Sequence, residues 1–124
     1  MSPDEQFDEA KRLFDAEQWQ DAAIMCNKVL AQVEHPLVIN LLGMSLMKLG
    51  KRDFAERVLY EGLALDAKCV PIMANLGNMY REDLRTKQAG DFLQAALRLQ
   101  PDNHQVNHNM AVLCLETGQF EEHI

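Results

Sequence analysis

The chain has 124 residues, of which 48% are hydrophobic and 25% are charged, and its net charge is −7. This composition is typical of one soluble globular domain, and 4 prolines and 6 glycines are too few for a chain that is disordered by composition. An acidic chain without a basic cluster is poorly suited to nucleic acids or to anionic membranes, so neither is expected as a partner.

The excess of negative charge lies mainly at the N-terminal end. Residues 1–35 hold eight carboxylates and three basic side chains, and eight minus three leaves five of the seven excess charges there. A solvated helix face explains this run more simply than an acidic docking surface does. Cys26, Cys69 and Cys114 are odd in number and widely spaced, so no disulfide framework is expected. Without an apolar leader or a membrane-length apolar run, the expected compartment is the cytoplasm.

Apolar residues recur at three- and four-residue steps along the chain, which predicts a series of amphipathic helices. The first helix is expected to begin near Pro3, and a break at Glu17 and Gln18 separates it from the second. The later helices are expected at residues 37–49, 53–65, 70–83, 86–99 and 104–117, with a last one starting at Phe120.

Glycine and capping residues predict where these helices end and begin. Gly50 and Gly118 are expected to close helices, and Asp102 and Asn103 to cap the helix that follows them. Leu84 stands at the place that Gly50 and Gly118 occupy in the neighbouring segments, so the turn at Leu84 is expected to differ.

The same kinds of side chain return about every 34 residues, as in the row of Gly43, Gly77 and Ala111. Further rows pair Ala55 with Ala89, Leu59 with Leu93, and Gly62 with Ala96. A fixed period of this length marks stacked helix pairs, each of which needs a neighbour to bury its apolar face. Glycine costs about 1 kcal/mol in a helix interior relative to alanine. Gly43 and Gly62 are therefore expected where two helix backbones approach closely.

This period, together with the run Leu76-Gly77-x-x-Tyr80 and then Ala89 and Pro101, resembles the tetratricopeptide repeat (TPR) family. The resemblance implies an all-α, right-handed α-solenoid of antiparallel helix pairs, a TPR-like superhelix of about three and a half repeats in a single domain. The repeats are expected at residues 3–35, 36–69, 70–103 and, incomplete, 104–124.

The two ends of the array are irregular. The step from the first repeat to the second, for example from Ala10 to Gly43, is one residue shorter than the period, as an end cap would allow. The fourth pair lacks most of its second helix, so Met110, Leu113 and Cys114 are expected to lack their cover. This ending indicates a fragment of a longer repeat protein, which we favour, or self-association through the incomplete repeat.

In TPR arrays the first helix of each pair lines a concave groove that binds a peptide or a partner segment. The resemblance therefore implies a protein-interaction module with a scaffold or adaptor role, and not an enzyme. The groove residues that it implies are Leu37, Asn40, Leu41, Met44, Met47 and Lys48 in the second repeat, Ala74, Asn75, Asn78, Arg81 and Glu82 in the third, and Gln105, His108, Asn109, Val112 and Glu116 in the fourth.

Two kinds of side chain in this groove suggest how a ligand is held. Asn75 and Asn109 lie one full period apart, and amides in a row can pair with the main chain of an extended peptide. Such a row is similar to the asparagine ladder of the O-linked N-acetylglucosamine transferase repeats. Met44 and Met47 suit adaptable apolar contacts. The alternatives are that the amides only solvate a surface and that the methionines pack against the first repeat.

Other sites are not supported by the sequence. The places of the clamp with which some TPR domains grip an acidic chaperone tail hold Asn40, Met44, Asn75, Gln105 and Asn109. They carry no positive charge, so this clamp is not expected. His104 and His108 are one helical turn apart, but no third metal ligand is evident, and no cofactor, metal or catalytic residues are expected.

Two further functions are left open. The chain is alternatively the substrate-docking repeat portion of a larger enzyme, of the glycosyltransferase or sulfotransferase type. It is alternatively a repeat scaffold that assembles by stacking its ends.

Overall fold

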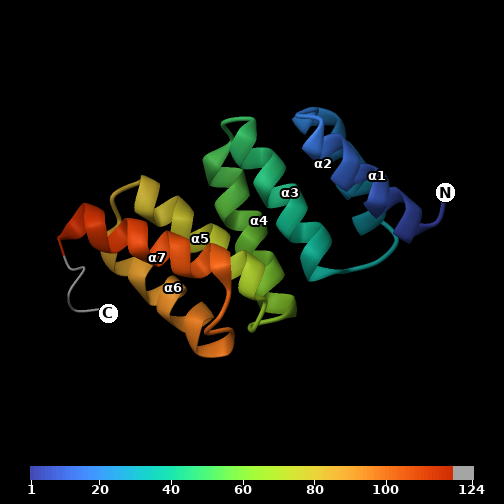
Figure 1. The fold of residues 1–124 in the computed structure, drawn as a ribbon. Helices are drawn as coiled ribbons and strands as arrows, with labels where there is room; N and C mark the ends of the chain where they lie inside the picture. The colour runs from blue at the N-terminus through green and yellow to red at the C-terminus, as the bar shows by residue number, and fades with distance from the viewer. Residues whose placement is uncertain (119–124) are drawn as a thin grey trace. The chain divides into compact units, whose positions relative to one another are not determined.

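The computed structural model describes residues 1–118, and within this range the chain is all-α, without strands. Seven helices follow one another (Figure 1): α1 (Pro3–Asp15), α2 (Trp19–Leu30), α3 (Pro36–Lys48), α4 (Arg52–Leu65), α5 (Val70–Glu82), α6 (Thr86–Leu99) and α7 (His104–Thr117). The expected all-α fold of consecutive helix pairs is confirmed. The helix expected from Phe120 lies outside the described residues.

Three helices, α1, α3 and α7, begin where a capping side chain satisfies a free backbone N–H group. Ser2 and Glu5 form a reciprocal capping box at α1, and the hydrogen bonds from Ser2 lower the pKa of the Glu5 carboxyl. At α3, His35 Nδ1 accepts a hydrogen bond of 3.1 Å from the second helical N–H. At α7, Asn103 Oδ1 accepts one of 3.0 Å from the third N–H, which confirms Asn103 as a cap.

The three turns that join α1 to α2, α3 to α4 and α5 to α6 have the same geometry. Glu17, Gly50 and Leu84 adopt left-handed φ values of 62°, 79° and 62°. The next residue in each turn donates its N–H to a carbonyl five residues back, over 2.9, 2.9 and 2.8 Å. The expectation that the turn at Leu84 differs is therefore wrong. Leu84 takes the glycine conformation because this hydrogen bond closes the helix, and its side chain is 83% exposed.

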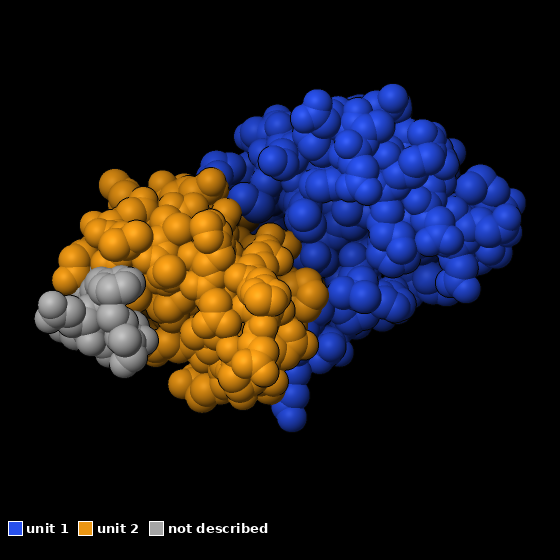
Figure 2. Space-filling view, in the orientation of Figure 1, with its two compact units in different colours: residues 1–69 blue, residues 70–124 orange. Residues whose placement is uncertain are grey.

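The chain divides into two compact units (Figure 2), which we call unit 1 (Met1–Cys69) and unit 2 (Val70–Ile124). In unit 1, α2 packs against α1 and α3, and α3 packs against α4. In unit 2, α6 packs against α5 and α7. Each unit therefore buries apolar surface between successive helices.

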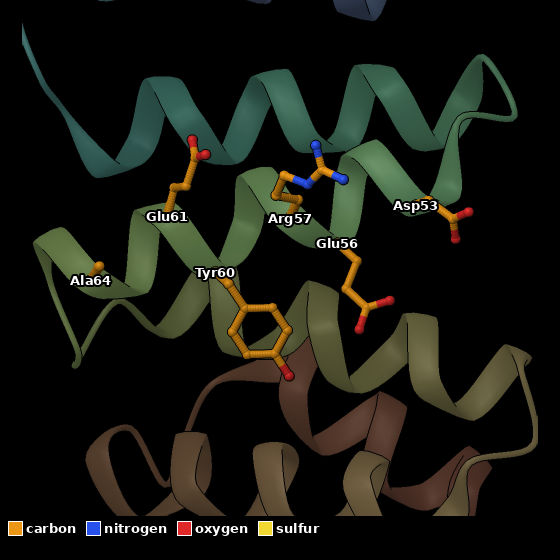
Figure 3. A pocket seen from close by; sticks show the side chains of 6 residues that line it. All are labelled: Asp53, Glu56, Arg57, Tyr60, Glu61 and Ala64. Atoms are coloured by element: carbon orange, nitrogen blue, oxygen red, sulfur yellow. The ribbon is translucent and has the colours of Figure 1, made fainter.

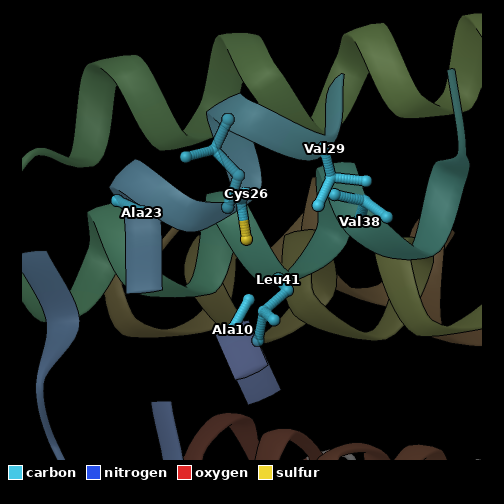
Figure 4. Close-up of a cluster of buried hydrophobic side chains, with 7 residues drawn as sticks. Ala10, Ala23, Cys26, Val29, Val38 and Leu41 are labelled. Carbon is cyan, nitrogen blue, oxygen red and sulfur yellow. The ribbon is translucent and has the colours of Figure 1, made fainter. Parts of the chain in front are cut away.

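The core of unit 1 gathers small and branched side chains from three helices (Figure 4). Ala10 of α1, Cys26 of α2 and Val38 of α3 are among its members, and all three are buried. Burial raises the pKa of the Cys26 thiol to about 12, so this thiol stays protonated at neutral pH. Cys26, Cys69 and Cys114 are all buried free cysteines, and Cys26 packs as a small apolar residue.

Glycine lets the paired helices approach closely at two equivalent places. A methyl group added at Gly43 would lie 2.6 Å from Leu59 Cδ2. One added at Gly77 would lie 2.8 Å from Leu93 Cδ2. Atoms cannot approach so closely, so a larger residue at either place would force the leucine of the partner helix to shift. The expected role of Gly43 in close helix packing is confirmed.

We predict that Leu84→Gly raises the free energy of unfolding by about 0.5–1 kcal/mol. The left-handed conformation costs a residue with a Cβ about 1–2 kcal/mol, and glycine offsets part of this gain through its freer unfolded state. Urea unfolding followed by circular dichroism measures the change. Gly50→Ala is the matched control and is expected to lower stability; an unchanged or lower stability of Leu84→Gly would contradict the strain at this turn.

We predict that Gly77→Ala lowers the free energy of unfolding by roughly 1 kcal/mol, because the clash with Leu93 outweighs the better helix propensity of alanine. In a Leu93→Ala background the same change is expected to be neutral or stabilising, since the clash is gone. Gly90→Ala is the control, because its added methyl meets Leu113 only at 3.9 Å. That change is expected to stabilise by up to about 1 kcal/mol. A double-mutant cycle by urea unfolding tests the coupling.

Candidate functional site

In unit 1, the residues expected to line a groove lie on α3 and differ in exposure. Leu37 is exposed, and Met44 and Met47 are half-buried. Asn40 is buried, and its Nδ2 donates to Met44 Sδ over 3.6 Å. Leu41 is buried in the core of unit 1. The accessible surface of α3 therefore combines leucine and methionine with the exposed Lys48, and little of the Asn40 amide is accessible.

In unit 2, the expected residues lie on α5 and α7. Asn75, Asn78 and Arg81 on α5 and Val112 on α7 are half-buried, His108 is exposed, and Asn109 is buried. The two amides expected to act alike thus differ, because Asn75 keeps part of its surface and Asn109 keeps little. Equal spacing in the sequence does not give them equal access to a ligand.

Arg81 ties α5 to α7. Its Nη1 donates to Glu116 Oε1 over 2.9 Å, and its Nη2 and Nε donate to Asn78 Oδ1 over 2.7 and 3.2 Å. The Arg81 side chain is 18% exposed and that of Glu116 is 47% exposed. The guanidinium carries five N–H groups, so two take no part in these bonds. The network fixes the position of the cation and balances its charge.

The period alone does not predict this network. Arg81 and Glu116 are separated by one residue more than the repeat period. Glu116 therefore lies one position beyond the residue of α7 that is equivalent to Arg81. The signal available in the sequence was a cation and a carboxylate expected on the same face of neighbouring first helices. Asn78, one helical turn before Arg81, completes the arrangement.

The end of α7 differs from the expectation. Met110, Leu113 and Cys114 were expected to lack cover, but all three are buried. They line a hollow of about 370 Å³ together with side chains of α6, which shields them. The exposed residues of α7 include Ala111, at the place equivalent to Gly43 and Gly77, and Leu115, which is 69% exposed.

A further hollow, of about 560 Å³, follows α4 (Figure 3). The side chains that line it are those of Asp53, Glu56, Arg57, Tyr60, Glu61 and Ala64. These side chains mix three carboxylates with one guanidinium and spread along the helix, so they do not converge on one point. This surface therefore has neither the enclosure nor the paired groups that catalysis or a small-molecule site requires.

Within residues 1–118, no three or more histidine, cysteine, aspartate or glutamate side chains are grouped as metal ligands. His104 and His108 are both exposed on α7. None of the helices in the described range combines the length and the apolar character needed to cross a bilayer.

No protein-family model and no curated protein sequence matches the chain. The fold, however, is similar to solved TPR domains. The Arabidopsis OM64 TPR domain has 16% sequence identity and a TM-score of 0.83, over 92% of this chain and 95% of that one.

Two domains of human RPAP3 are also similar. The first TPR domain has 15% identity and a TM-score of 0.83, covering 96% of this chain and 94% of that one. The second, solved in complex with the HSP70 peptide SGPTIEEVD, has 19% identity and a TM-score of 0.76, covering 90% of this chain and 98% of that one. The expected all-α solenoid of antiparallel helix pairs is confirmed, and the chain has the TPR fold.

Proposed function

We propose that the chain is a protein-interaction module that binds a peptide or a partner segment on its first helices, α3, α5 and α7. The TPR fold supports this role, and so does the peptide complex of the similar RPAP3 domain. A module of this kind acts as a scaffold or adaptor and is itself not an enzyme. We propose further that residues 1–124 form a single domain and that the protein works in the cytoplasm, where its three buried thiols stay reduced.

The observation that carries the proposal is the mixed surface of α5 and α7. Arg81 and Asn78 hold donors and acceptors in fixed positions on α5, and Val112 on α7 is half-buried. A fixed polar group next to apolar surface can hold an extended peptide, because the polar group orients the main chain and the apolar surface supplies buried area.

The ligand proposed here differs from an acidic chaperone tail. At the places of the acidic-tail clamp the chain has Asn40, Met44, Asn75, Gln105 and Asn109. None is a cation, and Asn40 and Asn109 are buried. The charge of Arg81 is balanced by Glu116. We therefore propose a ligand that is recognised through its main chain and apolar side chains and not through a terminal carboxylate.

We predict that peptides selected by the chain from a random phage-displayed library lose affinity about tenfold or more, roughly 1.4 kcal/mol, when Met44→Glu and Asn75→Glu are combined. The new carboxylates place charge on the contact surface and are costly to desolvate. Fluorescence anisotropy measures the binding. Circular dichroism confirms that the variants stay folded.

The control is Gln94→Glu on α6, which adds a charge to an exposed position on a helix without groove residues. It is expected to leave the affinity unchanged. If every selected peptide binds the double variant as tightly as the original chain, the proposed groove is wrong.

A second proposal is self-association through α7. Leu115 is 69% exposed, and Ala111 is exposed at a place where the other repeats pack a second helix. We predict that sedimentation velocity shows a mass that rises with concentration and that Leu115→Glu abolishes the rise. A strict monomer at all concentrations would exclude this proposal without affecting peptide binding.

A further inference from the structure

An apolar trough runs along unit 1 between α2 and α4, with α3 as its floor. It consists of two hollows of about 340 and 380 Å³, and Leu42 and Val58 line both of them. Ile24 and Phe54 face the first hollow, and Leu65 faces the second. The trough lies on the second helices of the pairs, so it is separate from the groove proposed on the first helices.

The other repeats provide an internal comparison for the two walls of this trough. Ile24 is 45% exposed and Phe54 is 57% exposed. The equivalent positions in the neighbouring repeats hold Arg57 and Asp91 for Ile24, and Asp21 and Gln88 for Phe54. These positions are therefore polar or charged elsewhere in the array. Facing apolar residues at normally polar positions mark a surface that binds another molecule.

Opposite charges stand at the two ends of the trough. Lys51 lies at the end where α2 and α4 begin, and Glu34 and Glu61 lie at the end where both helices finish. The helix dipoles of α2 and α4 add to this arrangement, since each places positive charge at its N-terminus and negative charge at its C-terminus. The trough therefore has a positive end and a negative end.

The walls of the trough indicate the secondary structure of the segment that binds there. The two walls, α2 and α4, and the floor, α3, are all helices, whose backbone N–H and C=O groups are paired within each helix. An extended segment would leave its own backbone groups unpaired against apolar side chains, whereas a helix pairs them internally. The stretch of α4 from Phe54 to Leu65 is about 16 Å long, which matches about three turns of a bound helix.

We propose that this trough binds an amphipathic helix of a partner protein, about three turns long. The helix lies antiparallel to α2 and α4, which places its positive N-terminal end beside Glu34 and Glu61 and its negative C-terminal end beside Lys51. Its buried face carries two large apolar side chains about two turns apart, one for each hollow. Basic residues near its N-terminus and an acidic residue near its C-terminus complete the match of charge.

The probe for this proposal is a synthetic, fluorescently labelled helical peptide with two leucines about two turns apart, two lysines at its N-terminal end and a glutamate at its C-terminal end. Fluorescence anisotropy with the full chain measures its binding. Ile24→Asp and Phe54→Gln each introduce the residue that the third repeat carries at the equivalent exposed position. These variants are therefore expected to fold normally and to bind about tenfold more weakly or worse.

The matched control is Leu99→Gln, which changes the exposed equivalent of Leu65 outside the trough and is expected to leave the affinity unchanged. A peptide with the lysines and the glutamate exchanged is expected to bind about tenfold more weakly at low salt, with the difference falling as salt is added. Met44→Glu with Asn75→Glu is expected to leave binding of this peptide unchanged, so the trough and the groove can fail separately.

Three results would overturn the proposal. The first is no saturable binding of the peptide, and the second is equal binding by Ile24→Asp. The third is a concentration-dependent dimer that Ile24→Asp abolishes while the peptide does not bind, because the trough would then accept a second copy of the chain.

Discussion

The close approach of the two helices in each pair is the contact on which the rest of the structure depends. Leu59 packs directly onto Gly43, and Leu93 packs onto Gly77. The distances leave no room for a methyl group, so the backbones are as near as a leucine side chain permits. One face of each of these first helices is therefore buried against its partner helix. Only the remaining faces are available for neighbouring helices or for a ligand.

A binding surface can therefore form only on helix faces that are not buried against another helix. The partly exposed faces of α3 and α5 carry Met44, Asn78 and Arg81, of which Arg81 also bonds Glu116 of α7. The outer faces of α2 and α4 are polar at most equivalent positions, and Ile24 and Phe54 are exceptions there. The array therefore fixes the backbone by a few small residues, while its specificity is left to side chains outside the helix-to-helix contacts.

The sequence was sufficient to predict the helices and their pairing. The short period of apolar residues predicts each amphipathic helix, and the 34-residue period predicts how the helices repeat. The helix positions must satisfy both periods. It was not sufficient for the turn at Leu84, since the hydrogen bonds that close α5 dictate the backbone more strongly than the side chain does. Nor does a period predict exposure: Asn75 and Asn109 occupy equivalent positions, but only Asn109 is buried.

The candidate sites also include features that the sequence predicts and features that it does not. The residues of the proposed groove follow from the TPR resemblance, whereas the contact of Arg81 with Glu116 depends on side-chain directions across two helices. The trough was missed because Ile24 and Phe54 lie far apart in the sequence on different helices, and neither is unusual by itself. Only the packing of α2 and α4 on α3 brings them to the same surface.

The ion pair between Arg81 and Glu116 has a consequence for selectivity. In the proposed groove, a ligand carboxylate near Arg81 would meet a cation whose charge Glu116 already balances, so little electrostatic free energy would be gained. An uncharged ligand in the proposed groove would leave the pair intact and could use the two guanidinium N–H groups that bond neither Glu116 nor Asn78. If Arg81 lines a ligand groove, as we propose, Glu116 would therefore disfavour anionic ligands there.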